Sequence, residues 1–141
     1  MIGYLDTSAL VKLLLREEEG ADLVGSIRDA TDVAVTSRIA YPEARAALAA
    51  ATRAGRLGPR EYGRSKRELT RAFGSLAVVE LDPRLAQAAG DVAERFDLRA
   101  YDAVHLASAL VVDDGTTVVV TWDRALATAA SAAGLDVAPR T

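Results

Sequence analysis

Short runs of β-branched residues alternate with longer helical patterns along the whole chain, and this alternation constrains the fold more than any other sequence feature. Strands separated by helices in this way are joined by crossover connections, which produce a parallel sheet with helices on both faces. The sequence therefore predicts a three-layer α/β fold with a central parallel sheet of four to five strands.

The expected elements follow from hydrophobic periodicity and from the positions of glycine and proline. Strands are expected at residues 2–5, 32–36, 77–81, 116–121 and around Val137. Helices are expected at about 8–15, 20–30, 37–54, from the Gly58-Pro59 turn to 73, from the Asp82-Pro83 cap to 96, and at 100–112 and 123–133. Pro42 should lie in the first turn of its helix, because a deeper position would cost ~3 kcal/mol.

A single domain accounts for the length, because compact domains typically hold about 100 to 200 residues. We therefore expect one domain over residues 1–141. The longest stretch without a charged residue, 125–135, has 11 residues. A membrane-spanning helix needs about 20 apolar residues. No basic leader precedes the first apolar run, so we expect a cytoplasmic protein without a signal peptide.

Basic residues are concentrated in one segment of an otherwise acidic chain. Residues 38–71 hold nine basic and three acidic residues, a local charge of +6, whereas the remainder carries −9. Such a segment could follow the phosphate backbone of a nucleic acid, with Arg60 and Arg64 as the expected contacts. A solvated helical face with ion pairs such as Arg64 with Glu68 is the simpler interpretation when this segment is considered alone.

Four acidic residues stand where a parallel α/β sheet would present its ligand site. Asp6 directly follows the first expected strand, and Asp123 follows the strand at 116–121. Glu43 and Asp102 lie near helix starts among apolar residues, where surface acids are not expected. Because ligands of such sheets bind outside the carboxyl ends of the strands, we expect the four acids to converge there.

Each aspartate also has a purely structural interpretation, since Asp6, Asp102 and Asp123 could each cap or stabilise a helix N-terminus. Capping explains Glu43 poorly, and it does not explain why two of the aspartates follow strands. Carboxylates within about 4 to 6 Å raise one another's pKa unless a cation neutralises them. The chain has no cysteine and one histidine, so Mg²⁺ or Mn²⁺ suits this oxygen-rich set.

Four features of the sequence, in order and with matching spacing, carry a family resemblance. They are YLDTSAL at 4–10, the helix-borne Glu43, LRAYDAVHLA at 98–107 and VVTWD at 119–123. Together they resemble the PIN-domain family, and more narrowly the VapC toxins of bacterial toxin-antitoxin pairs. The likeness spans nearly the whole chain and implies a PIN-like three-layer fold.

The resemblance implies a metal-dependent endoribonuclease that leaves 5'-phosphate and 3'-hydroxyl ends. It implies that Asp6, Asp102 and Asp123 bind Mg²⁺ or Mn²⁺, the last of them directly or through water. Glu43 would hold a metal-bound water or a second ion. One departure is Pro42, which precedes Glu43 where the family generally has a non-proline residue. This departure bears on the angle of the Glu43 carboxylate.

Two hydroxyl residues have an implied supporting role, because Ser8 and Thr121 would hydrogen-bond the metal-binding carboxylates. Metal sites generally require partners of this kind. The bound ion would lower the pKa of an attacking water and neutralise charge on the phosphate oxygens.

The resemblance further implies a homodimer and a small VapB-like antitoxin. The antitoxin would lie over the acidic cleft and present an arginine or lysine to the carboxylates. Apolar positions occur on the alanine-rich helix at 46, 47 and 49–51 and at Leu13 to Leu15. Such positions either complete the monomer's core or bury against another chain.

Three further signals have two interpretations each. His105 could ligate an ion with Asp102, although its apolar neighbours favour a packed, hydrogen-bonded histidine. Trp122 could stack on an RNA base or pack on the sheet edge. Residues 58–65 nearly match a phosphate-binding loop, but they follow a helix and not a strand, which excludes that function.

Other protein classes fit the sequence less well. A receiver-like module would need an acidic pair after the first strand and a lysine after the last, and neither is present. A serine hydrolase would need a G-x-S-x-G turn, which the sequence lacks. The remaining alternative to a nuclease is a catalytically inactive PIN-fold module that binds RNA or protein.

Overall fold

The computed structural model describes residues 1–16 and 18–140 and has a parallel sheet with the strand order β3-β2-β1-β4-β5. The strands are β1 (Ile2–Leu5), β2 (Val33–Ser37), β3 (Ala77–Val79), β4 (Thr117–Val120) and β5 (Asp136–Ala138). The helices are α1 (Thr7–Leu14), α2 (Glu18–Ala30), α3 (Ala40–Arg53), α4 (Pro59–Ser75), α5 (Pro83–Phe96), α6 (Ala100–Val112) and α7 (Arg124–Ala132). In the described part of the chain, no helix combines the length and apolar character needed to cross a bilayer.

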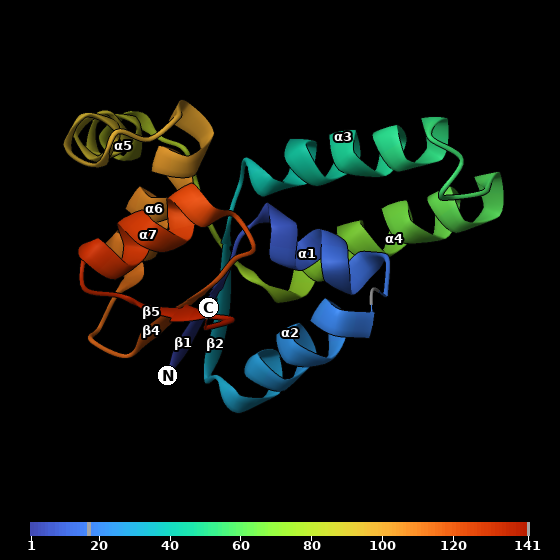
Figure 1. The fold of residues 1–141 in the computed structure, drawn as a ribbon, viewed down its shortest axis with the longest axis horizontal. Coiled ribbons are helices and arrows are strands. Elements are labelled where there is room, and N and C mark those ends of the chain that lie inside the picture. Colours follow the sequence, from blue (N-terminus) through green and yellow to red (C-terminus); the bar gives the residue numbers. More distant parts are fainter. Residues whose placement is uncertain (17, 141) are drawn as a thin grey trace.

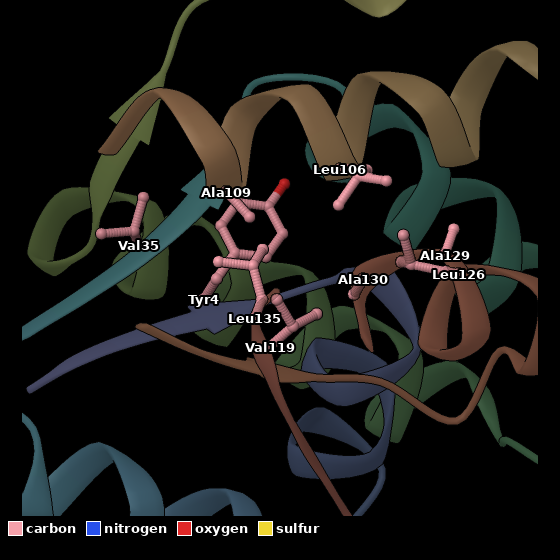
Figure 2. Close-up of a cluster of buried hydrophobic side chains, with 9 residues drawn as sticks. All are labelled: Tyr4, Val35, Leu106, Ala109, Val119, Leu126, Ala129, Ala130 and Leu135. Carbon is pink, nitrogen blue, oxygen red and sulfur yellow. The ribbon is translucent and has the colours of Figure 1, made fainter. Parts of the chain in front are cut away.

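The helices lie on both sides of the sheet, which confirms the predicted three-layer α/β fold. Helices α5, α6 and α7 lie on one side and α1 to α4 on the other (Figure 1). Successive strand residues point to opposite faces, so Tyr4 packs beneath α6 and α7 while Leu5 packs against α1. Figure 2 shows Tyr4 within the first of these cores, with its hydroxyl directed toward the helix that carries Leu106 and Ala109.

Several element boundaries differ from those predicted, and strand pairing explains the differences. Helix α3 begins at Ala40 and not at 37, because Ser37 is still paired with Val79 of β3. Strand β3 ends at Val79 and not at 81, since its one neighbour, β2, ends at that register. Pro42 is the third residue of α3, so its predicted position in the first turn is confirmed.

The topology brings the ends of β1 and β4 together at the centre of the sheet. The chain runs outward from β1 through β2 to β3, and then returns to add β4 on the other side of β1. Leu5 is in register with Val120, and the Asp6 amide donates to the Val120 carbonyl at 3.3 Å. The segments that follow β1 and β4 therefore emerge side by side, at the point where strand order reverses.

Candidate active site

Asp6 is the buried centre of the site, with 3% of its surface exposed. Its Oδ1 accepts from the Ser8 hydroxyl at 2.6 Å and from the Ala9 amide at 2.9 Å, and its Oδ2 accepts from the Thr121 hydroxyl at 2.5 Å. The bond from Ala9 caps α1, so the structural interpretation of Asp6 is correct. A carboxylate offers about four acceptor positions, and these three donors leave one of them, on Oδ2, available to a further ligand.

Burial raises the pKa of Asp6 above its usual value, although the hydrogen bonds from Ser8 and Thr121 act in the opposite direction. Desolvation disfavours the charged form of a carboxyl group. Neutral hydrogen-bond donors therefore compensate only part of the cost of an ionised Asp6. A nearby cation would supply the rest.

Two hydroxyls connect Asp6 to the loop after β4. Besides donating to Asp6, the Thr121 oxygen accepts from the Asp123 amide at 2.9 Å, and the Ser8 oxygen accepts from the Trp122 amide at 2.9 Å. Asp123 in turn accepts from the Leu126 amide at 2.9 Å and caps α7. The hydrogen bonds expected from Ser8 and Thr121 to a site carboxylate are therefore present, and they also orient the loop that carries Asp123.

Asp102 lies in the first turn of α6 and is partly buried. Burial raises the pKa of Asp102, and repulsion from Asp123 raises it further, with smaller contributions from Glu43 and Asp6. The other three predicted acids therefore all lie within electrostatic reach of Asp102, and the Thr121 hydroxyl links Asp6 to the amide of Asp123. Their joint role in one site stays a prediction.

Glu43 is held by two side chains that the sequence did not single out for this purpose. Its Oε1 accepts from the Thr7 hydroxyl at 2.7 Å and lies 2.8 Å from Nε2 of His105. On the other side of the imidazole, Nδ1 lies 2.7 Å from the hydroxyl of Tyr4. An ionised carboxylate can only accept, so Nε2 of His105 donates to Glu43 and Nδ1 accepts from Tyr4.

This chain of contacts keeps Glu43 ionised. Burial by itself would raise the pKa of Glu43, but the hydrogen bonds from His105 and Thr7 outweigh it and lower the pKa below its usual value. His105 is 3% exposed and hydrogen-bonded at both ring nitrogens, which confirms the packed interpretation. In the sequence, the spacing of three residues from Asp102 indicated that His105 could lie near the site. No feature of the sequence around His105 indicated that Glu43 is its hydrogen-bond partner.

The donor set suits a hard divalent ion, because it consists of carboxylate and hydroxyl oxygens. The mutual repulsion felt by Asp102 is the second feature that a cation would relieve. Among the described residues, no group of three or more histidine, aspartate or glutamate side chains is arranged so that it could hold a metal ion as it stands. The residues fit the ion by donor chemistry and charge, and not by a preformed coordination geometry.

The three residues outside the acidic cluster that could contact RNA lie in different surroundings. Trp122 packs partly buried against the core on the α1 side, and the Nζ of Lys12 lies 4.9 Å from its ring centroid. Arg60 is exposed near the start of α4. The Nε of Arg64 lies 3.7 Å from the carboxylate of Glu68, so the ion pair of the simpler interpretation is present.

The fold and the site define a three-layer α/β protein with an acidic centre at the carboxyl ends of its middle strands. The family model of the PIN domain matches residues 3–131. The chain is 48% identical over 136 residues to the ribonuclease VapC45 of Mycobacterium tuberculosis, which covers 96% of this chain and 94% of the relative. The chain therefore belongs to the PIN-domain family, and within it is similar to VapC ribonucleases.

Solved structures show the same fold. The structure of PAE2754 from Pyrobaculum aerophilum is 26% identical and superposes with a TM-score of 0.67, covering 97% of this chain and 89% of that one. VapBC2 from Rickettsia felis, solved with a DNA fragment from its promoter, is 11% identical with a TM-score of 0.68 and covers 97% of both chains. At that low identity the second likeness concerns the fold alone.

Proposed function

We propose that this chain is a VapC-like toxin, a metal-dependent endoribonuclease that hydrolyses RNA phosphodiester bonds with Mg²⁺ or Mn²⁺. The observation that carries the proposal is that Asp123, Glu43 and Asp6 all lie close enough to Asp102 to raise the pKa of its carboxyl group. The similarity to ribonucleases named VapC supports the choice of RNA as substrate.

The site residues divide the work between binding the ion and holding the attacking water. Asp6, Asp102 and Asp123 would hold the divalent ion, which supplies a water of lowered pKa and neutralises charge on the phosphate. Glu43 would hold a metal-bound water or a second ion. Both of its described donors contact Oε1, so Oε2 is the atom assigned to that contact. Ser8 and Thr121 would keep Asp6 oriented toward the ion.

The test of the metal assignment is Asp6→Asn, which removes one ligand charge while preserving shape. Cleavage of total cellular RNA should fall at least about 10²-fold across a titration of Mg²⁺ and Mn²⁺, and chelator should abolish it in the parent. Asp91→Asn, an exposed aspartate on α5, is the matched control and should cleave normally. Equal cleavage by parent and Asp6→Asn would refute the assignment. RNA binding without cleavage by the parent would favour an inactive PIN-fold module.

We further propose that the chain forms a homodimer and is held inactive by a small VapB-like antitoxin. Structural neighbours that are toxin-antitoxin complexes support this partner. Expression of the chain alone should arrest growth, Asp6→Asn should remove the arrest, and co-expression with the neighbouring small reading frame should relieve it. A harmless chain that stays monomeric at high concentration and binds no such product would contradict the proposal.

A further inference from the structure

A basic cavity of about 680 Å³ lies between α3 and α4, outside the acidic cluster. Arg45 of α3 lines one side, and residues of α4 line the rest, namely Gly63, Lys66, Arg67, Thr70 and Arg71. The lining thus holds four cationic side chains, no acid and no large apolar residue. We call this cavity the α3–α4 groove.

The cations of the α3–α4 groove have no carboxylate partner in the part of the chain that the structure describes. Among the described residues, none of the four has a carboxylate oxygen within 4.0 Å. The Nε of Arg45 is buried without a hydrogen-bond partner in that same part of the chain. Like charges gathered without counterions repel one another, and an anion bound among them removes that repulsion.

Aromatic side chains border these cations. Nη1 of Arg45 donates to the Tyr41 hydroxyl at 3.0 Å, and its guanidinium lies 5.7 Å from the Tyr41 ring centroid. The ammonium of Lys66 lies 4.6 Å from the ring centroid of Tyr62. Both rings pack against the core that α1, α3 and α4 share and do not line the groove, so they hold the two cations in place and leave the groove to bind through charge.

We propose that the α3–α4 groove binds the backbone of single-stranded RNA, and this rests on the proposed function because the RNA is the substrate of the acidic site. An acidic polypeptide is the competing ligand. Stable protein interfaces have an apolar core, and the lining of the groove offers no large apolar side chain for one. A string of phosphates needs only the cations and the Thr70 hydroxyl.

The groove contacts RNA away from the bond that is cut. Arg45 follows Glu43 by two residues on α3, and at 3.6 residues per turn the two side chains leave the helix on nearly opposite sides. An RNA strand that occupies both places therefore crosses the first turns of α3. Long substrates should depend on the groove, whereas an oligonucleotide that fills only the acidic site should not.

Arg60 and Arg64 provide an internal comparison, because they lie on the same helix but do not line the groove. Both are the contacts expected from the sequence, and that expectation stays a prediction. Removing the groove cations and removing this pair thus test two different surfaces with similar changes in charge.

The binding experiment uses the full chain carrying Asp6→Asn, so that RNA is not cleaved, and a labelled single-stranded RNA of about 20 nucleotides. Lys66→Ala/Arg67→Ala/Arg71→Ala should weaken binding at least about 10-fold and flatten its salt dependence by about 0.7 per lost phosphate contact. Arg67→Lys/Arg71→Lys keeps the charge and should retain binding within about threefold. Arg60→Ala/Arg64→Ala measures separately the contribution that the sequence predicts for that pair. The control is Arg84→Ala/Arg95→Ala, which removes two exposed cations of α5 and should change neither quantity substantially.

Two results would overturn the groove assignment. One is an unchanged affinity and salt slope in the folded triple alanine variant, with or without a loss in Arg60→Ala/Arg64→Ala. The other is normal RNA binding by the triple variant together with lost binding of the co-expressed small protein, which would assign the groove to an acidic polypeptide.

A cleavage experiment separates this proposal from the proposed function. With Asp6 intact, the triple alanine variant should cleave a short oligonucleotide as fast as the parent and a long RNA more slowly. Equal slowing on both substrates would overturn the groove assignment alone. If the parent cleaves neither RNA with any metal, the proposed function fails, and the binding comparison still decides the groove.

Discussion

His105 donates from Nε2 to Oε1 of Glu43 across 2.8 Å, although the two residues are 62 positions apart in the chain. The imidazole reaches Glu43 from within the core, where its other nitrogen meets the hydroxyl of Tyr4. Glu43 is thus oriented by a buried chain of hydrogen bonds that begins at Tyr4 on the central strand β1 and passes through His105.

Removing the imidazole of His105 should leave Glu43 poorly oriented, so that cleavage slows while RNA binding is kept. We expect His105→Ala to slow single-turnover RNA cleavage by about 10- to 100-fold, the range typical of residues that orient a functional side chain. The RNA Kd should change little, since His105 is buried. His105→Gln places an amide donor near Glu43 and should recover part of the rate. Equal losses in two folded variants would contradict the orienting role.

The hydroxyl of Tyr4 should matter for stability. Tyr4→Phe leaves Nδ1 of His105 buried without a partner, which costs about 1 to 3 kcal/mol. Thermal unfolding should therefore occur several degrees lower, at about 2 to 4 °C per kcal/mol. Tyr62→Phe is the matched control, because the Tyr62 hydroxyl has no hydrogen bond among the described residues. A Tyr4→Phe protein as stable as its parent would show that the contact contributes nothing.

Asp102 should destabilise the metal-free protein at neutral pH. Its pKa is raised by burial and by Asp123, so the folded state binds the proton more tightly than the unfolded state. The free energy of unfolding then falls as the pH rises from the pKa of the unfolded state, about 3.9, through the pKa of the folded state. The loss is complete at a pH above both pKa values.

Asp102→Asn removes this charge at every pH. In chelator at pH 7 its Tm should exceed that of the parent by about 1 to 3 °C, and the difference should vanish near pH 3, where both side chains are neutral. Millimolar Mg²⁺ should raise the Tm of the parent and not of Asp102→Asn. If the Tm of Asp102→Asn still exceeds that of the parent at pH 3, the electrostatic explanation is excluded.

Thr121 should tune metal affinity through Asp6. Thr121→Val removes the donor to Oδ2 with little change in shape and should weaken Mn²⁺ binding about 10- to 100-fold, measured by calorimetry. Thr36→Val is the control, because that buried threonine donates to the Leu5 carbonyl at 2.7 Å and not to a carboxylate. Thr36→Val should lose stability and keep the metal affinity. Equal Mn²⁺ affinities in the two variants would refute the role of Thr121.

Much of the fold could be predicted because it depends on local patterns. The helix expected at 100–112 has those bounds in the structure, and the predicted caps Asp82 and Asp123 both accept amide hydrogen bonds. Helical periodicity, capping and strand length are properties of neighbouring residues. The strand ends predicted from these local patterns also put Asp6 and Asp123 directly after strands.

The contacts that make these residues a site depend on the tertiary structure. Thr121 meets Asp6 because Leu5 and Val120 are in register across β1 and β4, and the groove forms because α4 folds back along α3. The path from Tyr4 through His105 to Glu43 likewise joins β1, α6 and α3. Local periodicity determines which face of an element is apolar, but only packing between elements determines which polar atoms come within hydrogen-bonding distance.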